Sequence, residues 1–151
     1  MIIKNYEIGE LQSFLFNLIL KNKESRMRTR FINLLSNQLD VIQRERQQLI
    51  NDYASKDNDG NIVTETRAFN NKEEEIVVFP SEEAEKDAQT QILILMNEDF
   101  IIEETADKME MLKTVQHIIL NCDLEFTGQK AVLYDRFCEI FEDIQDVEVA
   151  Q

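Results

Sequence analysis

The chain has 151 residues, with 16 Lys and Arg, 30 Asp and Glu, three Gly and one Pro, and its net charge is −14. This is the length of one ordinary domain, which folds without a disulfide or a metal. So few Gly and Pro exclude a β-sandwich or a barrel, whose chain reverses direction about every 8–12 residues. A hydrophobic fraction of 43% excludes a wholly disordered protein.

A first helix is expected over residues 8–21 and is predicted to be buried on more than one side. Its apolar residues recur at helical spacing, and two more widen the face: Ile8, Leu11, Phe14, Leu15, Phe16, Leu18, Ile19 and Leu20. Asn22 suits the end of this helix, because Asn tolerates the left-handed conformation of a C-cap. Ser25 is predicted to be the N-cap of the next helix.

The second helix is expected to be long, because no helix breaker occurs between residues 26 and 55. At 1.5 Å per residue it would extend for about 45 Å. Its apolar positions follow the alternating spacing of three and four that is typical of a helix packed lengthwise against others. These positions are Ile32, Leu35, Leu39, Ile42, Arg46, Leu49 and Tyr53, and only Arg46 is charged.

Residues 56–80 predict a turn and a small hairpin. The turn signal is Asn58-Asp59-Gly60-Asn61, and the β-rich runs 62–66 and 76–79 are joined by residues 70–74. A disordered loop is the alternative. The segment that begins at Ser55 partly resembles a calcium loop, but Ser55 and Thr66 stand where such a loop has an Asp and a bidentate Glu. A plain turn is therefore favoured.

The rest of the chain predicts three further helices. One starts at Ser81 and runs to about Asn97, one covers residues 106–122, and the last runs from about Gly128 to Val147. Residues 100–104 are compatible with a strand or with a continuing helix. The expected fold class is therefore mainly α, an antiparallel four- or five-helix bundle with a small β-hairpin excursion at about residues 61–79. Residues 1–151 are expected to form a single helical-bundle domain.

Few residue types suited to chemistry are present, so no catalytic, cofactor-binding or metal-binding residue is predicted and no enzyme is expected. His117 shares the polar face of its helix and is expected to face solvent. Cys122 and Cys138 fall at apolar helical positions and are expected to be buried in a reducing cytosol. No secretory signal is recognised at the N-terminus, and the longest apolar runs are too short to cross a bilayer. A soluble, cytoplasmic protein with no membrane contact is expected.

The charge is divided unevenly along the chain. Residues 1–56 carry a net charge of +3, and residues 57–151 carry −17. Five cations lie within ten residues near the predicted start of the long helix, where the helix dipole opposes them. These candidate partner-binding residues are Lys21, Lys23, Arg26, Arg28 and Arg30. Two interpretations stay open: acids of the later helices neutralise the cations, or the cations form an exposed patch for a partner.

Several short segments resemble a family of small helical proteins from phages and prophages of Gram-positive bacteria, which has no assigned function. The likeness lies in Ser25-Arg-Met-Arg-Thr29, Leu34-Leu35, Leu39, Glu45-Arg46, Leu49, Tyr53, Lys56-Asp57 and Gly60, and more weakly in Phe126-Thr-Gly-Gln129 and Tyr134-Asp135 with Cys138. The resemblance implies a helical bundle. It also implies a gene near tail and lysis genes, and hence a virion or tail-assembly role.

The expected function is that of a non-enzymatic phage or prophage protein that works through protein–protein contacts, in the bacterial cytoplasm or in the virion. Its partner would be a phage structural protein or a host protein, and self-association through the apolar seam stays open. The alternative is an acidic decoy that mimics nucleic acid and inhibits a host DNA-binding protein. Direct binding of nucleic acid is not expected, because the net charge repels phosphate.

Overall fold

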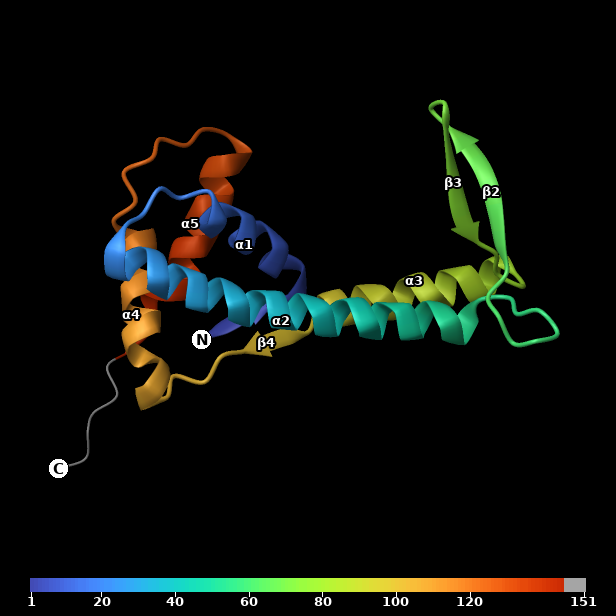
Figure 1. Cartoon of the computed structure of the whole chain (residues 1–151), viewed down its shortest axis with the longest axis horizontal. Coiled ribbons are helices and arrows are strands. Elements are labelled where there is room, and N and C mark those ends of the chain that lie inside the picture. The colour runs from blue at the N-terminus through green and yellow to red at the C-terminus, as the bar shows by residue number, and fades with distance from the viewer. Residues whose placement is uncertain (146–151) are drawn as a thin grey trace. The chain divides into compact units, whose positions relative to one another are not determined.

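The computed structural model describes residues 1–145 and is mainly helical within them (Figure 1). Five α-helices, one short 3-10 helix and two small two-stranded antiparallel sheets follow one another along these residues. The elements are β1 (Ile2–Lys4), η1 (Asn5–Glu7), α1 (Ile8–Phe16), α2 (Asn22–Tyr53), β2 (Thr64–Phe69), β3 (Lys72–Val77), α3 (Glu82–Met96), β4 (Asp99–Ile101), α4 (Ala106–Leu120) and α5 (Gln129–Glu142).

The chain divides into two compact units, and α2 contributes to both of them. The first unit contains Met1–Asp40 and the described residues from Glu98 onward, and the second contains Val41–Asn97. The single domain predicted from the sequence stays a prediction, and each unit is described by itself. Among the residues that the structure describes, none of the helices combines the length and the apolar character needed to span a membrane.

The core of the first unit is built by α1, the first part of α2, α4 and α5, together with the sheet of β1 and β4. Phe31 of α2 and Phe141 of α5 are fully buried, and their ring centroids are 5.4 Å apart. Ile3 of β1 is also buried and pairs with Phe100 of β4 in an antiparallel register. Residues 100 and 101 therefore belong to a strand, which is one of the two alternatives that the sequence left open.

The first helix is shorter than predicted. It ends at Phe16 rather than near residue 21, because Asn17 caps it and the N–H of Leu18 turns back to the carbonyl of Leu15 at 3.3 Å. Ile19 is fully exposed and Phe16 is 72% exposed, so the expectation that this segment is buried on several sides is wrong. Helical periodicity alone does not tell which of the apolar residues lose their contact with water.

The long second helix is confirmed, but its predicted start is wrong. It begins at Asn22, and Ser25 lies within its first turn, where the N–H of Ser25 bonds to the carbonyl of Lys21 at 3.4 Å. Asn22 does adopt the left-handed conformation, with φ of 54°, but at the start of α2 rather than at the end of α1. Of the predicted seam, Leu35 and Ile42 are buried, Arg46 is exposed, and the others are half-buried: Ile32, Leu39, Leu49 and Tyr53.

In the second unit the predicted hairpin is present between residues 61 and 79, with a tighter turn than expected. Asn70 and Asn71 both have positive φ, of 47° and 64°, and close a two-residue loop of the kind that fits the twist of a hairpin. Lys72 therefore already belongs to β3 and lies opposite Phe69. Both strands are exposed along almost their whole length, so the hairpin contributes little to the buried core of its unit.

The predictions for the other helices agree well with the structure. Ser81 caps α3, because its hydroxyl oxygen accepts a hydrogen bond from the N–H of Ala84 at 3.1 Å. The predicted helix at 106–122 corresponds to α4, and α5 ends at Glu142 rather than near Val147. Val147 itself lies outside the described residues.

Candidate interaction surface

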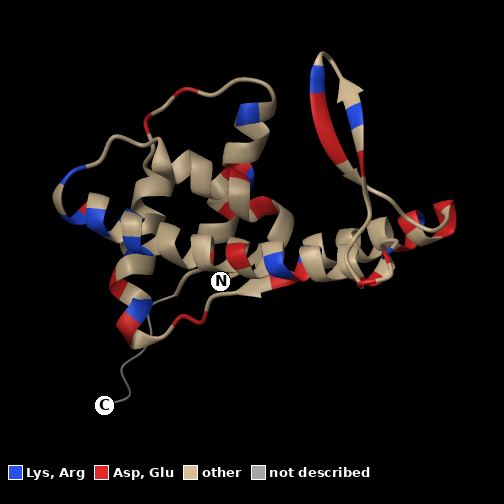
Figure 2. Cartoon of the chain, turned by 45° about the vertical axis from the view of Figure 1, so that its right-hand side comes forward, with Lys and Arg blue, Asp and Glu red and all other residues tan. Residues whose placement is uncertain are grey.

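The five predicted partner-binding cations lie in the first unit, at the α1–α2 turn (residues 17–21) and in the first turns of α2. Figure 2 shows basic residues gathered at this end of α2. Lys21, Arg26 and Arg30 are exposed, and Lys23 is also exposed but forms an ion pair with Glu110 of α4 at 2.6 Å. Arg28 is only half exposed. The five cations therefore do not share one environment.

Arg28 points toward the end of α1 rather than toward a partner. Its Nη1 donates to the carbonyl oxygens of Leu15 and Leu18 at 2.9 and 2.7 Å, and its Nη2 lies 3.5 Å from the hydroxyl of Ser25. The last carbonyls of a helix have no partner within the helix and carry partial negative charge. The guanidinium satisfies these carbonyls, so Arg28 is held by hydrogen bonds to the backbone and not by the acids that the sequence suggested.

Glu110 is the acid that the later helices bring to these cations. The hydrogen bond from Lys23 holds the pKa of Glu110 below its ordinary value, and the charges of Lys23, Arg30 and Arg26 act in the same direction. Arg30 and Arg26 are thus within electrostatic reach of Glu110 while remaining exposed. Lys23 and Arg28 therefore have partners within the fold, whereas Lys21, Arg26 and Arg30 are exposed, and their binding of a partner stays a prediction.

Exposed apolar side chains accompany this basic turn. Phe16 and Ile19 are three residues apart at the end of α1 and in the turn, and both are largely in water. Large apolar groups that cluster on a surface and are bordered by polar residues often mark a site of interaction.

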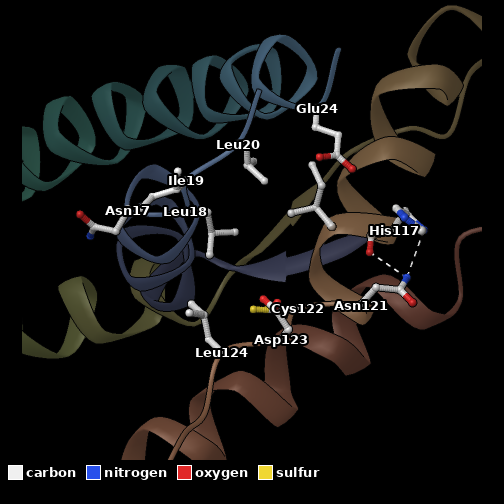
Figure 3. A pocket seen from close by; sticks show the side chains of 11 residues that line it. Asn17, Leu18, Ile19, Leu20, Glu24, His117, Asn121, Cys122, Asp123 and Leu124 are labelled. Atoms are coloured by element: carbon white, nitrogen blue, oxygen red, sulfur yellow. Dashed lines mark hydrogen bonds between the residues drawn. The ribbon is translucent and has the colours of Figure 1, made fainter. Parts of the chain in front are cut away.

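A groove runs beside the turn and has two adjoining pockets, of about 320 and 290 Å³, that share Asn17, Leu18 and Leu124. Figure 3 shows the first pocket, with the α1–α2 turn on one side and, on the other, His117 of α4, the C-cap residue Asn121 and residues 122–124. We call the two together the apolar groove. Its charged lining residues are Glu10, Glu24, Asp123 and Lys130.

Aromatic rings line the second pocket of the apolar groove. Phe126 stacks on Tyr134 with ring centroids 4.6 Å apart, and the ring of Phe14 is 6.0 Å from each and 5.2 Å from that of Phe137. The hydroxyl of Tyr134 donates to the carbonyl of Ile119 at 2.7 Å. Burial, together with a hydrogen bond to Cys138, raises the pKa of Tyr134 to about 12. The phenol is therefore neutral and fixed, and it serves as part of the wall.

The structure also places the other residues that the sequence singled out. His117 is exposed, as predicted, and its Nδ1 lies 3.1 Å from Nδ2 of Asn121. Cys122 and Cys138 are free and only half-buried, so the expectation of full burial is wrong. In the turn at residues 57–61, Oδ1 of Asp57 accepts from the N–H of Asp59 and of Asn61, both at 2.9 Å.

Within residues 1–145, no group of three or more His, Cys, Asp or Glu side chains is arranged to hold a metal ion. The sequence did not indicate the apolar groove, because its walls come from segments about a hundred residues apart. Comparison with protein-family models, with curated proteins and with solved structures finds no match.

Proposed function

We propose that the protein is a non-enzymatic phage or prophage protein with a structural or tail-assembly role, acting through protein–protein contacts. The observation that supports this most is the exposure of Phe16 and Ile19 beside the cations Lys21 and Arg26. Interface cores favour aromatic and aliphatic groups, and charged residues at the rim steer the partner. The phage assignment rests on the resemblance described above.

In this proposal the exposed cations Lys21, Arg26 and Arg30, with Lys23, meet an acidic surface of the partner, and Arg28 holds the turn in shape. The helices of the first unit form an antiparallel bundle that fixes the turn in place. The protein binds no cofactor and works in the host cytoplasm or within the virion.

The test is a proteomic comparison of purified virions, assembly intermediates and free protein from a producing strain. The proposal predicts that this chain accompanies virion components or an assembly intermediate through density-gradient purification. Its absence from every such fraction, while abundant as free protein, would contradict the structural role. A strain in which the gene is deleted provides the background for mass spectrometry.

A second candidate function is the acidic decoy, which is favoured by the carboxylates exposed in the second unit. β3 carries Glu73, Glu74 and Glu75 in succession, and the first turn of α3 carries Glu82, Glu83 and Glu85 (Figure 2). Successive strand residues point to opposite faces, so Glu74 is on the other face from its two neighbours. A salt-sensitive complex with a host DNA-binding protein, lost in a variant with these six Glu changed to Gln, would favour the decoy over the assembly role.

A further inference from the structure

The outer edge of β2 has backbone groups that nothing else in the hairpin uses. The sheet contains only β2 and β3, and the N–H of Val78 bonds to the carbonyl of Val63 at 3.0 Å, where the same register continues past the strands. In antiparallel pairs the direction of the backbone groups alternates along a strand, so those of Thr64, Thr66 and Ala68 point away from β3. Within the described part of the chain, no backbone hydrogen bond from outside the hairpin reaches these three residues, and the whole strand is exposed. An open strand edge of this kind is a template for another strand.

The charged side chains of β2 are arranged so that the strand complements a copy of itself. Glu65 and Arg67 lie on the same face of the hairpin, and Nη2 of Arg67 is 3.2 Å from Oε2 of Glu65. Arg67 also lies opposite Glu74 of β3. The six residues of β2 therefore carry no net charge, although the whole chain carries −14. An antiparallel copy of the strand presents the same two charges in the reverse order.

The register of such a strand pair follows from the backbone and the charges together. The outward backbone groups belong to even-numbered residues, so even-numbered residues of the two copies must lie opposite one another. The two longest antiparallel registers of this kind pair residues 64–68 or residues 65–69. The first places Thr66 opposite itself and Glu65 opposite Arg67, whereas the second places Arg67 opposite itself. Opposite charges across a strand pair are stabilising and like charges are destabilising, so the first register is favoured.

We propose that β2 pairs with β2 of a second copy of this chain in an antiparallel register centred on Thr66, so that two hairpins form one four-stranded sheet. Each Arg67 then lies opposite Glu65 of the other copy and next to Glu65 of its own strand. Phe69, which is 69% exposed, then lies opposite Val63 of the second copy. A two-stranded hairpin is only marginally stable in water, and a sheet of more strands is more stable. The proposed function concerns the α1–α2 turn instead, so either proposal can fail without the other.

The strand β3 is a poor alternative edge, and it limits the assembly to two copies. It carries Glu73, Glu74 and Glu75 in succession, and the two longest registers of β3 on itself place Glu74 or Glu75 opposite itself. In the proposed sheet the β3 strands are the outer ones. At about 4.8 Å between neighbouring strands, the two β3 strands are about 14 Å apart, beyond the Debye length of about 8 Å at physiological salt. Charged side chains on an outer edge oppose further pairing, and a two-fold symmetric contact closes as a dimer.

Sedimentation velocity on the full chain gives the first test. The new ladder covers residues 64–68 only, so the contact belongs to the small and transient class of below about 1,200 Å², and a dimer is expected only from about 0.1 mM upward. Pairing of β2 with β3 of another copy is heterologous and would continue as an open chain. A chain that stays monomeric up to about 1 mM, or that forms species larger than a dimer, would overturn the inference.

A pair of charge reversals tests the register. Glu65→Lys alone places a lysine opposite Arg67 of the second copy, and Arg67→Glu alone places a glutamate opposite Glu65, so each variant is expected to dimerise about tenfold more weakly. In an equimolar mixture of the two variants, both facing pairs again have opposite charges, and the mixed dimer is expected to recover most of the original affinity. Glu142→Lys makes the same change of charge as Glu65→Lys at another exposed position and is expected to dimerise like the original chain. A mixture that associates no better than either variant alone would contradict the register.

Blocking the edge tests the backbone contact without changing any charge. Thr66→Pro removes an N–H that points away from β3 and is expected to abolish the dimer while leaving the pairing of β2 with β3 intact. NMR contacts between residues 69 and 72 show whether each variant keeps its hairpin, and Glu65→Lys suffices for the test if another variant loses it. In a mixture of labelled and unlabelled original chain, contacts between the α-protons of Glu65 and Arg67 of different copies are expected. A Thr66→Pro variant that keeps its hairpin and dimerises normally would overturn the inference.

Discussion

Arg136 of α5 donates two hydrogen bonds to Glu7 of η1, which lies 129 residues earlier in the chain. Nε lies 2.6 Å from Oε1, and Nη2 lies 3.3 Å from Oε2. The side chain of Glu7 is only 7% exposed, and its Oε2 also accepts from the N–H of Lys4 at 2.9 Å. The pair therefore ties the last described helix to the first residues of the chain within the first unit.

Replacing Arg136 by Met is expected to destabilise the first unit by about 2–3 kcal/mol. The substitution leaves the carboxylate of Glu7 buried without its cation, which costs about 3–5 kcal/mol for a fully buried pair. The estimate is lower because Arg136 is 42% exposed. Urea unfolding measures the change. Glu139→Gln removes only the exposed partner of Arg136 and is expected to change stability by less than about 0.5 kcal/mol.

The same pair predicts a dependence of stability on pH. Burial alone would raise the pKa of Glu7, but the hydrogen bonds from Arg136 and from the N–H of Lys4 lower it, and the net value lies below the ordinary 4.5. A carboxyl whose pKa is lower in the folded state contributes stability above its unfolded pKa. That contribution is lost as the pH falls through the folded value.

The pH dependence is measured from urea midpoints of the original chain and of Glu7→Gln at a series of pH values from neutral to below 4.5. The original chain is expected to be the more stable at neutral pH, and the difference is expected to shrink in acid. A difference that is constant across this range would show that Glu7 is not held ionised by Arg136.

Arg28 is expected to be a structural residue of the α1–α2 turn. Replacing it by Met leaves the carbonyls of Leu15 and Leu18 without their donor and is expected to cost about 1.5–2 kcal/mol, the lower part of the range for hydrogen bonds to a charged group. Arg26→Met is the matched control, since Arg26 is exposed. Thermal unfolding compares the two variants, and an equal loss of stability in both would contradict the structural role of Arg28.

Ser81→Ala is expected to weaken the start of α3 by about 1 kcal/mol, because the N–H of Ala84 loses its acceptor. Ser81→Asp keeps an acceptor at the cap and is expected to retain the original stability. Hydrogen exchange at the amide of Ala84 reads this site directly. Faster exchange in the Asp variant than in the Ala variant would be inconsistent with the cap.

The hairpin turn offers a test of backbone conformation. Asn71 has φ of 64°, which Gly adopts freely and a β-branched residue adopts at a cost of about 1–2 kcal/mol or more. Asn71→Gly is expected to preserve or increase the population of the hairpin, and Asn71→Val to reduce it. Cross-strand contacts between residues 69 and 72, observed by NMR, measure that population. A Val variant with an unchanged hairpin would contradict the turn.

Features of the fold that depend on residues adjacent in the sequence could be predicted, and features that depend on residues far apart could not. Ser81 could be predicted as a cap, because its hydroxyl, the acidic residues that follow it and the helical pattern are adjacent in the sequence. The pairing of Ile2 with Ile101 could not, because three-residue strands about a hundred residues apart have no signal beyond their apolar character. The apolar positions within residues 16–20 continue past the end of α1, so the helix predicted from this pattern is too long.

The candidate surface was predictable only in part. The cluster of cations from Lys21 to Arg30 is visible in the sequence. Which of these cations have partners within the fold is not, because Arg28 bonds to backbone carbonyls and the partner of Lys23 lies on α4. The exposure of Ile19 depends on where α1 ends. Phe69 lies in the expected hairpin region. Its position next to the hairpin turn, however, depends on the left-handed conformation of Asn70 and Asn71.

The most direct test of the central claim, that the protein acts through contacts at the α1–α2 turn, is quantitative affinity purification from a phage-producing strain. The original chain is compared with Ile19→Glu and with Val132→Asp, each of which places a carboxylate at an exposed apolar position. The account predicts that Ile19→Glu loses the phage or host proteins that the original chain retains, whereas Val132→Asp keeps them. Identical sets of retained proteins for a folded Ile19→Glu variant and the original chain would contradict it.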